Sequence, residues 1–365
     1  MTLQGKGFFI WKIRDTENGD ANAIADLAHK AKLTHVLIKI ADGSNSYNID
    51  SATGVDLIPA VAKALRARAI QVWGWHYVYG YDPIGEANIA IQRVQQLGLD
   101  GYVIDAEAEY KQPGKDVAAS RFMSQLRGAL PKIPIALSSY RYPSYHPQIP
   151  WKQFLEKCDF NMPQVYWVLN HNPGEQLIRS LQEFQTLVPF RPVIPTGAAF
   201  KEHGWVPTVE DEIEFMRAAQ DLHLNAVNFW EWSNCRLNLP TIWDAIQEYN
   251  WDVGPLPVDI TQKYIDTLNT HDLDKVLALY TTTAVHVTSS QTIQGEAAIR
   301  KWYNAFFSKT LPNATFTLTG FSGTGNSRHL TWTATSSTGK VLNGNDTLSL
   351  VNGKIAYHYS YFTVT

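Results

Sequence analysis

The chain has 365 residues, of which 45% are hydrophobic, so it is long enough for a large core and a smaller second domain. Its formal net charge of −3, without a long basic run, argues against nucleic acid or an anionic membrane surface as the main partner. No apolar segment approaches the roughly 20 residues of a membrane helix, and no secretory leader precedes the first strand. We therefore expect no membrane span, and a location that is cytoplasmic or, if a leader was trimmed, secreted.

The cysteine and aromatic content limits the kinds of functional site that we expect in the chain. The two cysteines, Cys158 and Cys235, are too few for a disulfide framework, and neither has a Cys or His at metal-ligand spacing. We predict two structural thiols, no metal and no organic cofactor. The 12 tryptophans and 17 tyrosines are an unusual supply of rings, and those that lie outside the core are suited to stacking on sugars.

Eight short apolar runs alternate with helical stretches in residues 1–250. The runs are residues 7–13, 35–40, 71–78, 101–107, 134–139, 160–167, 192–198 and 226–232. Helical periodicity lies between them, for example over residues 21–32, 55–67 and 210–222. Continuous apolar strands alternating with helices predict an α/β fold, and eight units match a closed (β/α)8 TIM barrel. An open doubly wound sheet is the alternative, but no glycine-rich phosphate loop follows the first strand.

The fourth run leads directly into acid, in the stretch DGYVIDAEAEY at residues 100–110. Because side chains alternate along a strand, Asp105 and Glu107 are expected to point the same way, with their Cα atoms about 6–7 Å apart. Two carboxyls this close disfavour ionising together, so one pKa should rise. A protonated acid beside an ionised partner suits glycoside cleavage. Ordinary solvated acids at a strand end are the alternative.

The C-terminal ends of the other strands carry rings and polar groups, and in such barrels the functional residues lie at these ends. This composition is typical of a carbohydrate cleft, and predicts a polysaccharide or oligosaccharide as the partner. The predicted substrate-binding residues are Lys39, Asp42, Trp75, His76, Tyr77, Tyr140, Gln164, Tyr166, Trp230 and Trp232.

A change of pattern marks a second domain. Residues 251–257 contain a glycine and two prolines and are predicted to be a linker, followed by a domain at 258–365. Helical periodicity over 260–280 and 296–307 precedes strand-like runs at 315–321, 329–336, 341–351 and 354–364. The Asn352-Gly353 pair between the last two is a strong hairpin signal. We predict a small α+β cone whose strands form an antiparallel meander.

Four motifs in the first domain carry a family resemblance. They are VLIKIADG at residues 36–43, GWHY at 74–77, DAE at 105–107 and FWEWS at 229–233. With them, residues 7–235 resemble the barrel of the family 25 glycoside hydrolases, the lysozymes that cut peptidoglycan. The stretch at 100–107 is also similar to the family 18 chitinase signature, with Val103 in place of its middle aspartate. The resemblance implies a glycosidase acting on N-acetyl amino-sugar polymers.

On this hypothesis Glu107 is the general acid, and Asp105 stays ionised to orient or stabilise the acetamido group of the substrate. One difference from the family 25 pattern argues against catalysis by the barrel. Phe9 occupies the place of the family 25 aspartate on the first strand, so the carboxylate cluster is one residue short. The alternative is therefore a catalytically inactive, sugar-binding barrel.

The second domain carries its own resemblance. Residues 266–280, followed by GEAAI at 295–299, resemble a SnoaL-like domain of the nuclear transport factor 2-like group. The resemblance implies a cone with an internal pocket, in which we nominate His286, Trp302, Asp346 and His358. It also implies a role in homodimerisation or small-ligand binding, which is a further alternative for the function of the chain.

Overall fold

The structure is a computed structural model that describes residues 3–251, 259–323, 326–351 and 353–365. The chain divides into two compact units, Met1–Gly254 and Pro255–Thr365. Apart from Trp251, the predicted linker at 251–257 lies outside the described residues. No helix in the described part of the chain has both the length and the apolar character that crossing a membrane requires.

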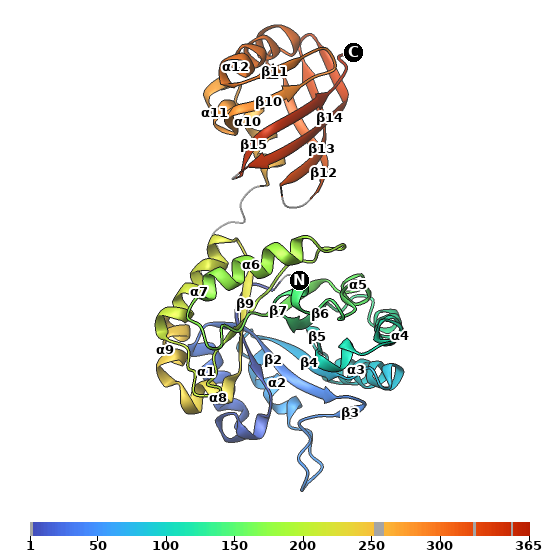
Figure 1. The fold of residues 1–365 in the computed structure, drawn as a ribbon, viewed down its shortest axis with the longest axis vertical. Coiled ribbons are helices and arrows are strands. Elements are labelled where there is room, and N and C mark those ends of the chain that lie inside the picture. The colour runs from blue at the N-terminus through green and yellow to red at the C-terminus, as the bar shows by residue number, and fades with distance from the viewer. Residues whose placement is uncertain (1–2, 252–258, 324–325, 352) are drawn as a thin grey trace. The chain divides into compact units, whose positions relative to one another are not determined.

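A closed ring of eight parallel strands forms the first unit (Figure 1). The strands are β1 (Gly5–Ile10), β2 (Leu33–Asp42), β4 (Gln71–Val78), β5 (Gly101–Ala106), β6 (Ile135–Tyr140), β7 (Phe160–Gln164), β8 (Thr196–Ala198) and β9 (Ala226–Trp230). They pair in chain order, and β1 pairs with both β9 and β2, which closes the ring. The short β3 (Asn45–Ser46) adds an antiparallel edge to β2. The predicted parallel barrel is confirmed.

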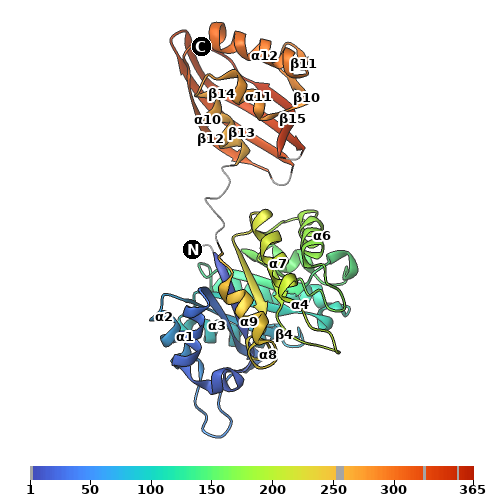
Figure 2. The ribbon, with the colours of Figure 1, turned by 90° about the vertical axis from the view of Figure 1, so that its left-hand side faces the viewer.

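Helices surround this ring (Figure 2). They are α1 (Ala21–Lys30), α2 (Ile58–Arg66), α3 (Pro83–Leu97), α4 (Lys115–Ala129), α5 (Trp151–Leu155), α6 (Pro173–Gln185), α7 (Val209–Asp221), α8 (Trp232–Asn238) and α9 (Pro240–Glu248). Local chemistry fixes where several begin. The Asp20 side chain accepts from two backbone amides at the start of α1, and Thr208 and Asp211 form a capping box at the start of α7.

The inside of the barrel is filled by side chains. Phe9, Leu37, Trp75, Val103 and Met162 belong to one buried cluster there. A filled barrel leaves room for a ligand only at its mouth, where the strands end.

The second unit is a six-stranded sheet with helices on one face (Figure 1). The helices are α10 (Ile260–Leu268), α11 (Leu273–Ala278) and α12 (Glu296–Ala305), which ends in a π turn at Phe306–Thr310. The strands β10 (Tyr280–Val287), β11 (Thr292–Gln294), β12 (Thr315–Ser322), β13 (Ser327–Ser336), β14 (Gly339–Val351) and β15 (Lys354–Tyr361) are ordered β11-β10-β15-β14-β13-β12.

One expectation for this unit is wrong. The single helix predicted over 260–280 is two helices, because His271 adopts a left-handed φ of 53° and Asp272 then caps the start of α11. The predicted antiparallel meander is confirmed for β12 to β15, which pair in chain order. The unpredicted strand β10 pairs in parallel with β15 in the middle of the sheet.

Candidate functional site

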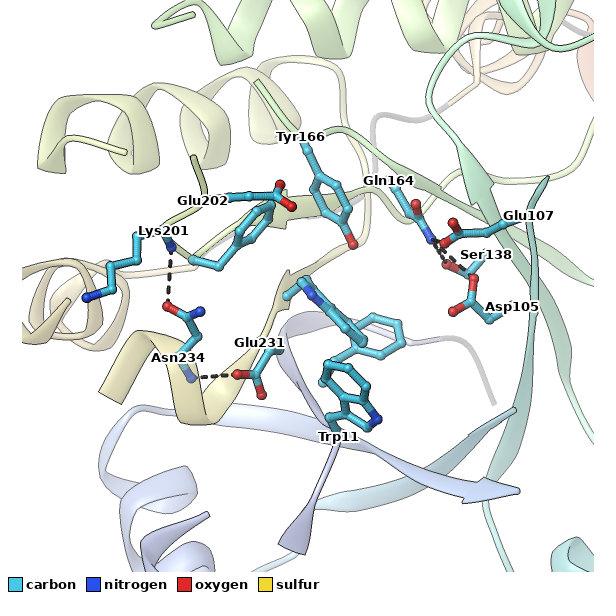
Figure 3. Close-up of a pocket in the computed structure, with 13 residues that line it drawn as sticks. Trp11, Asp105, Glu107, Ser138, Gln164, Tyr166, Lys201, Glu202, Glu231 and Asn234 are labelled. Atoms are coloured by element: carbon cyan, nitrogen blue, oxygen red, sulfur yellow. Dashed lines mark hydrogen bonds between the residues drawn. The ribbon is translucent and has the colours of Figure 1, made fainter. Parts of the chain in front are cut away.

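A cavity of about 420 Å³ opens at the C-terminal ends of the barrel strands (Figure 3). Two acids and an amide line one side of the cavity, and aromatic rings line its middle. A second set of polar side chains, which includes Lys201 and Asn234, lines the opposite side. The lining residues are Phe9, Trp11, Asp105, Glu107, Ser138, Gln164, Tyr166, Phe200, Lys201, Glu202, Trp230, Glu231 and Asn234. Five of the residues predicted for the site therefore meet in one cavity: Asp105, Glu107, Gln164, Tyr166 and Trp230.

Asp105 and Glu107 converge on one amide. Nε2 of Gln164 donates to Oδ1 of Asp105 at 3.2 Å and to Oε1 of Glu107 at 2.8 Å. Glu107 lies just beyond the end of β5, with φ −129° and ψ −129°, so strand alternation does not aim its side chain. The two carboxyls nevertheless meet, because both accept from the same Gln164 nitrogen.

The surroundings of Asp105 favour the protonated form of its carboxyl. Only 7% of Asp105 is exposed, and burial, followed by the charge of Glu107, raises its pKa well above the usual range. The positive charge of Lys39 opposes this rise. This direction is opposite to the one that an ionised Asp105 requires, because burial disfavours the charged form of its carboxyl.

Aromatic rings form the middle of the cavity. The ring of Trp230 lies 6.1 Å from that of Trp11 and 5.6 Å from that of Phe9, measured between centroids. Trp11 is 42% exposed, which leaves ring surface open to a ligand. Tyr166 packs edge-on against Phe200 at 5.2 Å. Phe9, at the position where the resemblance led us to expect an aspartate, thus packs on other rings.

Three predicted substrate-binding residues have structural roles. Trp75 is 2% exposed, donates to the carbonyl of Ile10 at 2.9 Å, and packs edge-on against Trp230 at 5.2 Å between ring centroids. His76 is fully buried and donates from Nε2 to the carbonyl of Gly43 at 2.7 Å. Burial lowers the pKa of His76 to about 4.

Trp232 is the third predicted substrate-binding residue with a structural role. It is fully buried and donates to Oε1 of Glu17 at 3.0 Å. The predicted substrate contacts are therefore wrong for Trp75, His76 and Trp232. The reason is shared: apolar or aromatic neighbours cover each of these side chains, so no surface is left for a sugar.

Lys39 and Asp42 lie at the mouth but outside the 420 Å³ cavity. Their side chains form an ion pair at 3.0 Å, and Lys39 is only 4% exposed. The ammonium group lies 4.4 Å from the ring of Tyr47 and 4.9 Å from that of Trp75. Asp42 also accepts from the hydroxyl of Tyr79 at 2.8 Å and lines a separate, more open depression.

Tyr77 and Tyr140 flank the cavity without lining it. The hydroxyl of Tyr77 donates to Glu109 at 2.8 Å, and its pKa is raised by burial and by this bond. The ring of Tyr140 stacks on His146 at 3.7 Å, with the ammonium of Lys111 4.0 Å from its centroid.

The sequence-based prediction missed several residues of the polar wall opposite Asp105 and Glu107. Lys201, Glu202 and Asn234 line the cavity but follow the ends of β8 and β9 in loop and helix, where no periodic pattern marks them. Glu231 caps α8 by accepting from the backbone amides of Ser233 and Asn234. In the sequence, only their closeness along the chain to the end of a predicted strand could have pointed to these residues.

The nominated residues of the second unit lie close together. His286, Asp346 and His358 are all fully buried on the inner face of the sheet. Nε2 of His358 lies 3.0 Å from Oδ2 of Asp346, and the two imidazole rings stack in parallel at 4.2 Å. Nδ1 of His358 lies 2.6 Å from the hydroxyl of Tyr280, which is 2.7 Å from that of Tyr303.

Comparison with known proteins bears on this unit. Residues 261–358 match the family model of the SnoaL-like domain. The second unit is a SnoaL-like domain. An NTF-2 like protein from Burkholderia xenovorans LB400 is 15% identical over 29% of this chain and 81% of its own, with a TM-score of 0.26. An NTF2-like protein from Cytophaga hutchinsonii ATCC 33406 is 13% identical over 29% of this chain and 88% of its own, with a TM-score of 0.25. No curated protein matches the chain.

A cavity of about 380 Å³ adjoins the buried cluster of the SnoaL-like domain. Trp302 lines it and packs edge-on against His286 at 4.4 Å, and Ser360, which also lines it, is 2.8 Å from Nε2 of His286. Within the buried cluster of Tyr280, His286, Tyr303, Asp346 and His358, two side-chain atoms have no hydrogen-bond partner among the described residues: Nδ1 of His286 and Oδ1 of Asp346. Such atoms are costly to leave unpaired, so they mark a place for water or a ligand group.

Proposed function

We propose that the barrel is a glycoside hydrolase that cleaves N-acetyl amino-sugar polysaccharide such as peptidoglycan. The observation that supports it is the convergence of Asp105 and Glu107 on the Gln164 amide, in a ring-walled cavity of about 420 Å³. Two carboxyls that share a proton beside exposed aromatic surface match the requirements of acid-catalysed glycoside cleavage.

In the proposed mechanism the proton held by Asp105 passes to Glu107 when substrate enters. Glu107 gives it to the glycosidic oxygen as the bond from that oxygen to C1 breaks. The acetamido carbonyl oxygen of the substrate attacks C1, and Asp105, now ionised, accepts a hydrogen bond from the acetamido N–H. Water then opens the cyclic intermediate with Glu107 as the base, so the configuration at C1 is retained.

The experiment incubates the full chain with peptidoglycan, chitin oligomers and plant polysaccharides, and assays for new reducing ends. Glu107→Gln is expected to reduce release by at least about a hundredfold while polymer binding persists, because only the transferable proton is removed. Glu202→Gln is the matched control, since it changes an acid of the same cavity outside the pair. Full activity of Glu107→Gln would remove the assignment.

The inactive, sugar-binding barrel remains the alternative, favoured by the ring of Phe9 in place of an acid. It predicts affinity for chitin or peptidoglycan fragments without release of reducing ends from any polymer. The same assay therefore decides between the two.

A second candidate function belongs to the SnoaL-like domain: binding of a small uncharged molecule. It is supported by the 380 Å³ cavity, whose described lining residues include no acid, lysine or arginine, and by the unpartnered Oδ1 of Asp346 nearby. Binding of an apolar fluorescent dye to the full chain, and its loss in Trp302→Ala, tests it. Homodimerisation through this domain is a separate proposal, which sedimentation of the full chain tests.

A further inference from the structure

Three basic side chains gather beside the acid pair, on the side of the barrel mouth that β5, β6 and β7 form. Lys111 ends the 3-10 turn that follows Glu107 directly. Arg141 follows the last residue of β6, and His146 lies five residues further along the chain. All three side chains are partly exposed, so a ligand at the mouth has access to them.

The fold holds each of these basic groups in place. The ring of Tyr140 contacts two of them: the ammonium of Lys111 lies 4.0 Å from its centroid, and the ring of His146 stacks on it at 3.7 Å. Arg141 is held separately, because its Nη1 donates to the carbonyl of Tyr166. That carbonyl takes one of the five guanidinium N–H donors, so others remain for a ligand.

The positive charges of this cluster have no acidic partner. Neither Lys111 nor Arg141 forms an ion pair with an acid in the parts of the chain that the structure describes. Lys39, at the same mouth, is paired with Asp42 at 3.0 Å. Burial, and then the charges of Lys111 and Arg141, lower the pKa of His146, as expected for basic groups that lie close together. Like charges gathered without a counter-ion attract an anion from outside the chain.

The cluster adjoins the proposed cleavage site. Tyr140 pairs in register with Gln164, whose amide holds both acids, and paired strands are about 4.7–4.9 Å apart. Arg141 bonds to the backbone of Tyr166, and both Gln164 and Tyr166 line the 420 Å³ cavity. A substituent on a sugar in this cavity therefore lies beside the basic groups.

The charge of the cluster indicates the kind of substituent. Asp105, Glu107 and Glu109 give the mouth a negative potential that repels an anionic polymer, and the three basic groups reverse its sign locally. Guanidinium and ammonium donors match the oxygens of a carboxylate. Chitin is uncharged and gains nothing from them, whereas the lactyl and peptide carboxylates of peptidoglycan do.

We propose that Lys111, Arg141 and His146 form an anion subsite, which binds a carboxylate of the polymer that lies in the barrel cavity. The identity of the polymer rests on the proposed function. Within that function the subsite favours an acidic amino-sugar polymer, peptidoglycan, over a neutral one such as chitin. The basic groups bind and select the polymer, and the two acids perform the cleavage.

The test measures co-sedimentation of the full chain with insoluble peptidoglycan and with chitin, in the Glu107→Gln background so that both polymers stay intact. Lys111→Gln is expected to weaken binding to peptidoglycan by at least about fivefold, because a charge-assisted contact is lost, and to leave binding to chitin as it was. Lys111→Arg keeps the charge and should retain most of the binding. Lys132→Gln is the control, since it removes an exposed positive charge just before β6 begins.

Chemical treatment of the polymer identifies the anion. Amidation of the peptidoglycan carboxyls is expected to lower binding of the Glu107→Gln chain to the level of the Lys111→Gln variant, and to have little further effect on that variant. Removal of phosphate-bearing wall polymers with hydrofluoric acid should leave binding unchanged. Added salt should weaken peptidoglycan binding less steeply in Lys111→Gln.

Four outcomes would overturn the subsite as proposed. The first is peptidoglycan binding that Lys111→Gln leaves unchanged, and the second is an equal loss on chitin, which would point to disturbed packing around Tyr140. The third is binding that depends on the wall phosphate and not on the carboxyls. The fourth is no binding to either polymer by the Glu107→Gln chain. Arg141→Gln repeats the test in case Lys111→Gln unfolds.

Failure of the subsite and failure of the hydrolase are distinguishable, because binding is measured with Glu107 replaced and release of reducing ends with Glu107 intact. Charge-dependent binding without release from any polymer would leave the subsite and end the hydrolase. Release without charge-dependent binding would do the reverse.

Discussion

Nε2 of Gln164 lies 2.8 Å from Oε1 of Glu107, although 57 residues separate the two along the chain. The bond joins the end of β7 to the turn after β5, across one intervening strand. The same nitrogen donates to Asp105, so one amide holds both acids in position.

Gln164→Leu is expected to lower the release of reducing ends by about ten- to a hundredfold, because a hydrogen bond to a charged group contributes roughly 1.5–3 kcal/mol. Initial rates on chitin oligomers measure it. Ser138→Ala is the control, since that hydroxyl lies 3.5 Å from the amide and its loss should change the rate far less. Equal losses in both variants would contradict the role of the amide.

Asp105→Asn is expected to stabilise the barrel at neutral pH. The pKa of Asp105 is raised in the folded state, so the folded chain binds more protons than the unfolded chain above about pH 4, and stability falls as pH rises through this window. Each unit of pKa displacement corresponds to about 1.4 kcal/mol. Asparagine removes the charge and keeps a polar group of the same shape.

Thermal unfolding at pH 4 and pH 7 measures this effect. The advantage of Asp105→Asn should be small at pH 4 and grow towards pH 7. Asp26→Asn, at an exposed ion pair, should show no such growth. A variant that is equally destabilised at both pH values would contradict the raised pKa.

Lys39→Met is expected to move the alkaline limb of the activity profile to higher pH. The charge of Lys39 lowers the pKa of Asp105, so its removal lets the pair keep its proton further into the alkaline range. The pH dependence of kcat/KM measures the shift. Lys39→Arg keeps the charge and should leave the limb in place; a shift of the same size there would point to disrupted packing.

Tyr280→Phe is expected to destabilise the SnoaL-like domain by about 1–3 kcal/mol, because its buried hydroxyl lies between His358 and Tyr303 and both lose a partner. Hydrogen exchange of β10 and β15 amides reports the loss within this domain. Tyr359→Phe removes an exposed hydroxyl of the same sheet and should cost almost nothing. Unchanged exchange in Tyr280→Phe would show that the buried network contributes little.

The sequence predicted the barrel because a parallel ring requires continuous apolar strands at regular intervals, and each such strand can be recognised from a few consecutive residues. The sequence-based prediction failed at 260–280, where helical periodicity continues through Leu268 and Val276 although the helix is interrupted at His271. Periodicity records which side chains are apolar. It does not record a change of direction that one residue makes.

Sequence by itself determined the strands of the barrel, their order and the residue types at their ends, because these follow from short-range patterns of burial. Only the tertiary structure decided which of those residues share a cavity. Both faces of a barrel strand are buried, so Trp75 and His76 look in sequence like rings of the cleft, as does Trp232 at the start of α8. Only packing shows that neighbours cover all three. The burial of Asp105, and with it the raised pKa of its carboxyl, likewise depends on which parts of the chain cover that group.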